Sequence, residues 1–271
     1  MTKYNKLISN ITSDKERLFF KSNDTSFFNI YTTGNLDGES AFKFSKNIEV
    51  ENSYFSLRYP FWNCENVEVY QSNFLSTCRG PFWYSKDIII KDCSFYGDKV
   101  LRECENINFS NGSLLGDESL IKCKKINLMN INIESIYAFL HCEDIVATNL
   151  LLKGKYSFQY SKNIDLTRGK LMTKDPFWHS ENIIVKDMEI VGEYVAWYTK
   201  NITFVRCKIS SKQPFCYSEN IKFIDCELID CDYLGEESDL KGNIITKNCI
   251  IYNPKDISSL SIEGNYKLIE E

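Results

Sequence analysis

Residues that could do chemistry recur in this sequence at a spacing of about 19 residues. Two neighbouring positions of the repeat hold all four tryptophans and both histidines, together with tyrosine, glutamate and lysine, and a third position adds further tyrosines. From this set we single out nine candidate ligand-binding residues: Trp62, Trp83, Tyr84, Tyr137, Tyr156, Tyr160, Trp178, Trp197 and Tyr198.

Four titratable residues of the same set are candidates for catalysis: Glu103, Lys122, His141 and His179. The first three follow one another at successive repeats, so strands stacked about 4.8 Å apart would bring them within about 10 Å of one another. Aromatic side chains beside hydroxyl and charged groups suit an extended polar ligand such as a glycan. Aromatic files also stabilise stacked strands without any ligand, so both interpretations stay open.

The repeat that must position these residues is organised around Asn and Asp. The segment Ser45–Val50 returns as Cys64–Val69, with alternating apolar residues that are typical of a strand with one buried face. Asn and Asp tolerate the left-handed backbone of tight bends, and a fixed period near 20 with strand content predicts a solenoid. The anchors are Asn47, Asn66, Asp87, Asn106, Lys125, Asp144, Asn163, Asn182, Asn201, Asn220 and Asn243.

We therefore predict an all-β fold, a parallel β-helix of about eleven turns. The repeat runs without a break, so residues 1–271 are expected to form a single domain. Regular turns should cover residues 41–252. Residues 1–40 are expected to form an N-terminal cap with a partial first turn, and residues 253–271 a C-terminal cap, because a β-helix must protect its edge strands.

The position before each anchor alternates in charge along the chain. Opposite charges on neighbouring strands stabilise a sheet and like charges oppose it, so these residues predict a salt-bridge ladder that fixes the register of the coils. They are Lys46, Glu65, Lys86, Glu105, Lys124, Glu143, Lys162, Glu181, Lys200 and Glu219. We expect these charges to be structural, with each exposed pair contributing about 0–1 kcal/mol.

Composition limits the cellular compartment and the kinds of binding partner that we expect. The net charge is −5 and no basic block stands out, which argues against nucleic acid as a partner. No apolar run is long enough for a membrane span or a signal peptide. The eleven cysteines interchange with Ser and Thr and resemble small buried fillers. We expect a cytoplasmic protein with reduced thiols and without a metal or cofactor; the oligomeric state is not determined by these features.

The repeats also carry a resemblance. Units of the form Ser/Cys-Glu/Lys-Asn-Ile-x-Val, combined with Pro-Phe-Trp at Pro60–Trp62 and Pro176–Trp178, resemble a family of uncharacterised bacterial proteins in the pectin-lyase-like superfamily. The resemblance covers roughly residues 40–252. It implies a right-handed coil, because spacing alone would also allow a left-handed one.

Two functions from different classes follow. The first is a non-catalytic binding or scaffold protein that holds a carbohydrate or another protein along the aromatic positions. The alternative is a carbohydrate-active enzyme, a lyase, hydrolase or isomerase, because the superfamily includes pectate lyases and polygalacturonases. Such hydrolases need two carboxyl groups at a set separation, and neither an Asp-Asp pair nor a Gly-His-Gly sequence occurs here. Shared fold does not carry activity, so we favour the binding protein.

Overall fold

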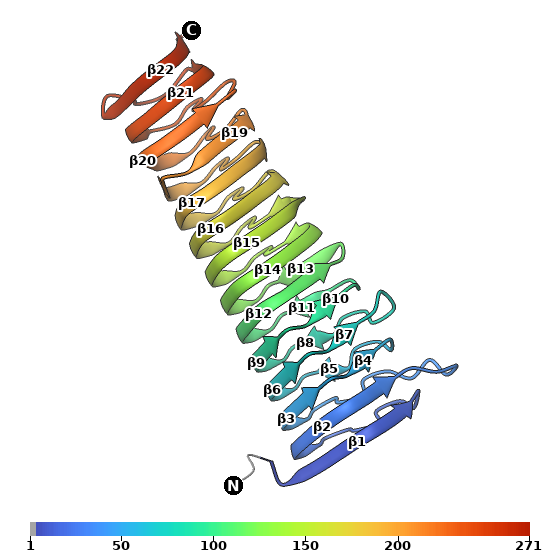
Figure 1. The fold of residues 1–271 in the computed structure, drawn as a ribbon. Helices are drawn as coiled ribbons and strands as arrows, with labels where there is room; N and C mark the ends of the chain where they lie inside the picture. Colours follow the sequence, from blue (N-terminus) through green and yellow to red (C-terminus); the bar gives the residue numbers. More distant parts are fainter. Residues whose placement is uncertain (1–3) are drawn as a thin grey trace. The chain divides into compact units, whose positions relative to one another are not determined.

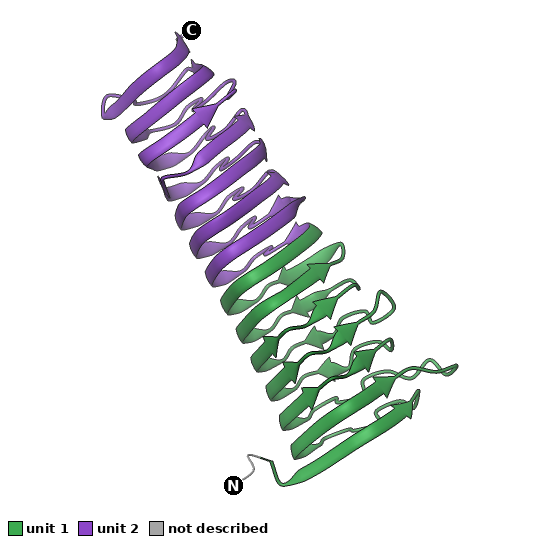
Figure 2. Cartoon of the chain, viewed as in Figure 1, with its two compact units in different colours: residues 1–135 green, residues 136–271 purple. Residues whose placement is uncertain are grey.

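The computed structural model describes residues 4–271, in which every regular element is a β-strand. Strands of consecutive coils pair in parallel, which makes the chain a parallel β-solenoid with about 14 coils and a period of about 19 residues (Figure 1). The predicted all-β fold is confirmed. The chain divides into two compact units, residues up to 135 and residues 136–271 (Figure 2). Residues 4–271 contain no helix long and apolar enough to cross a membrane.

Most strands of the first unit are short, and its last strand, β14, runs across the boundary at residue 135. These strands are β1 (Lys6–Ser13), β2 (Asn23–Thr32), β3 (Lys46–Glu51), β4 (Tyr54–Phe55), β5 (Phe61–Trp62), β6 (Glu65–Tyr70), β7 (Asn73–Phe74), β8 (Phe82–Trp83), β9 (Lys86–Lys91), β10 (Ser94–Phe95), β11 (Val100–Arg102), β12 (Glu105–Leu115), β13 (Glu118–Ile121) and β14 (Lys124–Ala138).

The second unit has longer strands that continue through the bend after the anchor. They are β15 (Glu143–Ser157), β16 (Lys162–Lys174), β17 (Glu181–Glu193), β18 (Lys200–Val205), β19 (Lys208–Lys212), β20 (Glu219–Ile229), β21 (Leu240–Tyr252) and β22 (Leu260–Ile269). In both units equivalent residues lie side by side: Ile48 pairs with Val67, and Ile183 pairs with Ile202.

The coil number exceeds the eleven that the sequence predicted because strands at both ends of the described chain continue the stack. In the range 1–40, β1 pairs in parallel with β2 and β2 pairs with β3. In the range 253–271, β22 pairs with β21. Asn5 and Asp24 continue the anchor series, and the backbone N–H of Asn5 donates to the Asp24 carbonyl oxygen at 3.0 Å. The longer step from Asp24 to Asn47 hides this relation in the sequence.

Files of phenylalanine fill the core. In the first unit Phe61 stacks between Phe42 at 4.9 Å and Phe82 at 4.6 Å between ring centroids. In the second unit the ring centroid of Phe158 lies 4.4 Å from that of Phe139 and 5.2 Å from that of Phe177. All of these rings are fully buried. Offset stacks of this kind add to the hydrophobic free energy of burial, so identical residues at successive turns favour the coil register.

The chain reaches the next anchor through a tight segment in which bulky residues adopt a left-handed backbone. Phe158 has φ 59° and Tyr160 has φ 55°, and the equivalent Phe177 and His179 have φ 67° and 52°. Such angles cost about 1–2 kcal/mol for residues other than glycine. The backbone N–H of Phe158 donates to the carbonyl oxygen of Ala138 on the preceding coil at 2.8 Å. Burial of the ring and this hydrogen bond offset the cost.

A buried file of Ser, Thr and Cys lies beneath the corner before each anchor. The Ser161 hydroxyl accepts the backbone N–H of Cys142 at 2.8 Å and donates to the Phe139 carbonyl oxygen at 2.5 Å. Ser218 repeats the arrangement with Thr199 N–H at 2.8 Å. The sequence predicted small buried fillers; the structure adds that their hydroxyl groups satisfy backbone groups that would otherwise be buried without partners.

Ten of the eleven predicted anchors take the left-handed backbone; the exception is Asn243, whose side-chain amide donates to Asp225 and not to the anchor file. Asn182 has φ 58° and Asn201 has φ 56°. Side-chain amides link Asn182 to Asn163 at 3.3 Å and Asn201 to Asn182 at 3.2 Å, and the file continues to Asn220 at 2.8 Å. Each corner therefore satisfies its amide on the neighbouring coil.

Ion pairs form along much of the predicted charge ladder. Glu65 contacts Lys46 at 2.9 Å and Lys86 at 3.2 Å, and Lys200 contacts Glu219 at 3.4 Å. Glu105 departs from the pattern because its carboxylate contacts Lys125, the anchor of the next coil, at 2.7 Å. The charges on this face are therefore engaged with one another.

We expect the stability of the protein to fall between about pH 7 and about pH 3. The Lys46 and Lys86 ammonium groups lower the pKa of Glu65, and the Arg206 guanidinium lowers that of Asp187. A carboxyl group whose folded pKa is lowered stabilises the fold above its unfolded pKa, and this contribution is lost as pH falls through the folded value. Thermal unfolding followed by circular dichroism should show a lower midpoint in acid. Because these pairs are exposed, the decrease should be smaller at high ionic strength. Equal midpoints at both pH values would contradict the ladder's contribution.

Candidate binding surface

The best-ordered candidate site is a file of five exposed rings in the second unit, which we call the aromatic ladder. Each ring belongs to a residue that immediately precedes the buried Ser, Thr or Cys of the corner, and each has a left-handed backbone, with φ between 52° and 56°. This backbone turns the side chain away from the core. The ladder consists of His141, Tyr160, His179, Tyr198 and Tyr217.

The rings of the aromatic ladder are stacked face to face. Successive ring centroids are 5.0, 5.3, 4.9 and 5.2 Å apart, and successive planes differ by 18°, 5°, 8° and 15°. The faces of the three central rings are therefore covered by their neighbours. What solvent reaches is the ring edges, which bear hydroxyl groups and imidazole nitrogens.

These edges offer a row of unoccupied hydrogen-bonding groups. Tyr160 is 48% exposed and Tyr198 is 40% exposed. Within residues 4–271, the hydroxyl groups of Tyr160 and Tyr198 make no hydrogen bond, and neither do the imidazole nitrogens of His141 and His179. A tyrosine hydroxyl both donates and accepts, and a neutral imidazole carries one donor and one acceptor. The ladder can therefore bind polar groups at a pitch of about 5 Å.

Tyr217, the last ring of the ladder, is already engaged. A hydrogen bond with the Glu236 carboxylate, together with burial, raises the pKa of the Tyr217 hydroxyl to about 12. Its backbone N–H also donates to the Glu236 carbonyl oxygen at 2.8 Å. The Tyr217 hydroxyl thus stays protonated at neutral pH. Because it already bonds to Glu236, the row of unoccupied ring edges ends at Tyr198.

Two tryptophans support the ladder from behind and are half-buried. The Trp178 ring stacks on His179 at 5.8 Å between centroids. Trp197 meets Tyr198 and Tyr217 edge-on at 6.2 Å and 5.6 Å, and its indole N–H donates to the Gln213 carbonyl oxygen at 2.5 Å. The exposed position of the repeat is thus the one that holds histidine and tyrosine. The tryptophans hold those rings in place.

A second, shorter stack lies elsewhere in the second unit. Tyr137 and Tyr156 stack at 5.2 Å with their planes 27° apart, and Tyr137 is 39% exposed.

The aromatic candidates of the first unit form a separate cluster. Trp62 and Trp83 lie 5.1 Å apart, and Tyr84 contacts them at 5.8 Å and 5.7 Å. The Arg102 guanidinium lies 5.3 Å from the Trp83 ring centroid and the Lys43 ammonium 5.1 Å from that of Trp62. Cation–π contacts of this kind stabilise the pairs. Two ring faces that a ligand could have used are therefore already covered.

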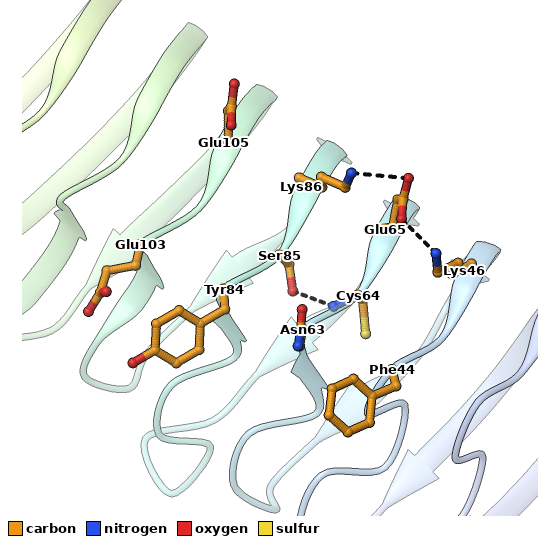
Figure 3. A pocket seen from close by; sticks show the side chains of 10 residues that line it. All are labelled: Phe44, Lys46, Asn63, Cys64, Glu65, Tyr84, Ser85, Lys86, Glu103 and Glu105. Atoms are coloured by element: carbon orange, nitrogen blue, oxygen red, sulfur yellow. Dashed lines mark hydrogen bonds and ion pairs between the residues drawn. The ribbon is translucent and has the colours of Figure 1, made fainter.

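A shallow groove of about 300 Å³ runs beside this cluster. Figure 3 shows Phe44 and Tyr84 on one side, the ion pairs of Lys46 and Lys86 with Glu65 on the other, and Cys64 and Ser85 between them. The corner residues form one wall of this groove and the charge ladder forms the other. Phe44 was not among the sequence candidates, although it is the exposed residue two positions before Lys46.

The four catalytic candidates are divided between the two units. Glu103 and Lys122 lie in the first unit, where no ion pair joins them among the described residues, and Glu103 contacts Arg102 at 3.7 Å. His141 and His179 lie in the second unit on either side of the Tyr160 ring. Among the described residues, no ion pair therefore joins two of these candidates within either unit.

Burial suppresses the reactivity of some of the cysteines. All eleven are free and buried, as the sequence predicted, and burial raises the pKa of both Cys64 and Cys93 to about 12. A thiol is a nucleophile only as the thiolate, so these groups are inert at neutral pH. Within residues 4–271 no group of three or more His, Cys, Asp or Glu side chains gathers in a way that could hold a metal ion.

By sequence, the chain belongs to the family described as "Protein of unknown function (DUF3737)", whose model matches residues 6–264. No curated protein matches the sequence. Among solved structures it is similar to PfbA, a surface adhesin of Streptococcus pneumoniae, at 13% identity and a TM-score of 0.29, covering 92% of this chain and 70% of PfbA. It is also similar to the catalytic domain of a GH87 alpha-1,3-glucanase, at 12% identity and a TM-score of 0.24, covering 91% of this chain and 53% of that one. Likeness at this level carries no argument about ligand or activity.

Proposed function

We propose that this member of the DUF3737 family is a non-catalytic binding protein that holds an extended carbohydrate chain along the aromatic ladder. The observation that supports it best is the unbroken stack of His141, Tyr160, His179, Tyr198 and Tyr217, with centroid spacings of 4.9–5.3 Å. Stacking fixes the ring orientations before any ligand arrives. Such preorganisation lowers the entropic cost of binding.

The chemistry of the ladder favours a polar chain over an apolar one. Its ring faces are covered, so the contacts it offers are hydrogen bonds from ring edges and not stacking onto flat platforms. Hydroxyl-rich polymers present donors and acceptors repeatedly along their length, which matches a row of tyrosine hydroxyl and imidazole groups. Each contact is weak, with a net contribution of about 1 kcal/mol, so useful affinity requires several successive rings.

The enzymatic alternative has less support. A glycoside hydrolase needs one carboxyl group that is protonated at working pH. In the groove of the first unit, lysine side chains lower the pKa of Glu65 and of Glu105, so both stay ionised near neutral pH. This is the opposite of what a general acid requires.

Membership of the pectin-lyase-like superfamily stays a proposal.

We also propose that the protein works in the cytoplasm. Its eleven free, buried thiols suit a reducing compartment, where disulfides do not persist. Fractionation of the native host, followed by detection with an antibody, would test this. Recovery outside the cytoplasm would contradict it.

Isothermal titration calorimetry with a panel of linear oligosaccharides tests the proposed function. Tyr198→Phe removes one hydroxyl group and keeps the stack, and it should weaken binding about 5-fold, which corresponds to one hydrogen bond. Tyr96→Phe is the matched control, because Tyr96 is 45% exposed and belongs to the first unit, which holds no ring of the ladder. It should bind as the unmodified chain does. If no sugar in the panel produced a heat of binding, carbohydrate binding would be refuted. If both substitutions weakened binding equally, the site would be refuted.

A further inference from the structure

The last strand of the described chain, β22, presents an open edge. Among residues 4–271 it pairs with β21 and with no other strand. The opposite edge of such a strand bears main-chain N–H and C=O groups that point to solvent, and an uncovered edge of this kind is a template for pairing with another strand. Eight of its ten residues are exposed, so β22 is accessible to a partner.

The face of β22 that continues the core is uncovered as well. Ile262 lies beside the buried Ile244, and Leu268 lies beside the buried Ile251. Leu268 is nevertheless 45% exposed, and Tyr266 is 41% exposed. Residues of the core file are thus left in solvent at this end, and covering them would be favourable by about 25 cal/mol per Å² of apolar surface.

The sequence of β22 is complementary to itself when it is read in the opposite direction. With Asn265 on a twofold axis, Glu263 of one chain lies opposite Lys267 of the other, and Ile262 lies opposite Leu268. Opposite charges that face each other across antiparallel strands stabilise the pair. A shift by one residue would instead place Ile262 opposite Lys267, so this register is specified.

The geometry at the middle of β22 is compatible with such an axis. Gly264 has φ +100°, and the register with β21 shifts between Thr246 and Cys249. This irregularity divides β22 into two arms of similar length. A twofold axis through it lays each arm on the opposite arm of the second copy, which is the self-complementary contact of a symmetric dimer. Neither Glu263 nor Lys267 has an ion-pair partner within the described residues, so both are available.

We infer that β22 is the interaction surface for a second copy of this chain, in antiparallel pairing centred on Asn265. The dimer continues the sheet from one solenoid into the other and covers Ile262 and Leu268 from both copies. It contributes two Glu263–Lys267 pairs, one on each side of the axis. We assign the partner as a second copy of this chain because the residues that complement β22 lie on β22 itself.

Charge reversal tests the pairing and its register by analytical ultracentrifugation of the full chain. The unmodified chain should sediment as a dimer. Glu263→Lys and Lys267→Glu, each alone, should weaken dimerisation at least 10-fold, because like charges then face each other. The double substitution should restore the dimer, and an equimolar mixture of the two single variants should form a heterodimer. A monomeric unmodified chain, or single variants that dimerise as it does, would overturn the inference. Circular dichroism of each exposed-site variant confirms that it is folded.

A cysteine at the axis provides an independent test of the same register. In Asn265→Cys two copies of the residue lie directly opposite, with Cα atoms about 4.5–5.5 Å apart, which is within disulfide range. Mild oxidation should therefore yield a covalent dimer on a non-reducing gel. Ser261→Cys is the control: it lies four residues, or about 13 Å, along the strand from the axis, and it should stay monomeric on the gel. Equal cross-linking of both variants would contradict the register, and the native cysteines do not interfere because they are buried.

Discussion

Replacing Phe158 by alanine is expected to lower the free energy of unfolding by about 3–5 kcal/mol. The Phe158 ring is fully buried and stacks between Phe139 and Phe177 at 4.4 Å and 5.2 Å. Its removal loses the transfer free energy of the ring, leaves a cavity and interrupts the phenylalanine file. The backbone around it is held by hydrogen bonds to the neighbouring coils, so the cavity can close only partly. Unfolding in guanidinium chloride, followed by circular dichroism, measures the loss.

Tyr160→Ala is the matched control for this prediction. Tyr160 lies two residues further along the same coil and also has a left-handed backbone, but it is 48% exposed. The substitution removes only ring contacts within the aromatic ladder, which contribute about 1 kcal/mol to the free energy of unfolding. Similar losses for the two substitutions would show that the core does not lie where the coil register places it.

Substituting Gly192 by alanine is expected to destabilise the protein by about 3 kcal/mol. A Cβ atom at this position would lie 1.8 Å from the carbonyl oxygen of Thr173 on the preceding coil. Thr173 and Gly192 are paired residues of β16 and β17, so the clash can be relieved only by separating two hydrogen-bonded strands. The free energy of unfolding should again be measured by denaturation.

Val191→Ala serves as the comparison for Gly192. Val191 is adjacent in β17, and its side chain is 39% exposed, so its truncation should change stability by less than about 1 kcal/mol. If Gly192→Ala were tolerated as well as Val191→Ala, the close approach between these coils would not exist in solution.

Much of the fold could be predicted because the same residue type recurs at the same place in every coil. Asn182 and Asn201 were predicted to mark corners and do so in the structure, and Phe158 and Phe177, which recur at the same spacing, lie in the core. The coils at the ends were missed because their spacing changes. Asp24 and Asn47 are separated by an enlarged loop, and Asn243 is not an anchor, because it bonds to Asp225, five residues after the anchor Asn220.

The orientation of the candidate residues was harder to predict than their alignment. Strand alternation places residues two apart on the same face, yet Phe158 points into the core and Tyr160 points into solvent. Both residues adopt positive φ, which breaks the alternation. Because bulky residues rarely take this conformation, the sequence gives no direct signal for it. By contrast, the stacking of equivalent rings on successive coils could be predicted from the repeat alone.

The side-chain contacts that already engage some candidate groups could not be predicted from the sequence either. Arg102 covers the Trp83 ring and Glu236 binds the Tyr217 hydroxyl. Each takes the place of an aromatic residue on the next coil: Arg102 pairs with Trp83, and the Tyr217 N–H donates to the Glu236 carbonyl oxygen. Such contacts depend on side-chain reach between neighbouring segments. They decide which of the aligned groups stay free for a ligand, and they concentrate the free groups on Tyr160, His179 and Tyr198.

The most direct test of the aromatic ladder is how affinity depends on ligand length. Calorimetric titration with oligosaccharides of one linkage and increasing length should show affinity that rises with each added sugar while further rings are engaged. It should then level off once the chain spans the four rings whose edges are free. Each added contact should contribute about 1 kcal/mol or less. Affinity that is already maximal for a disaccharide, or that does not respond to length at all, would contradict binding along the ladder.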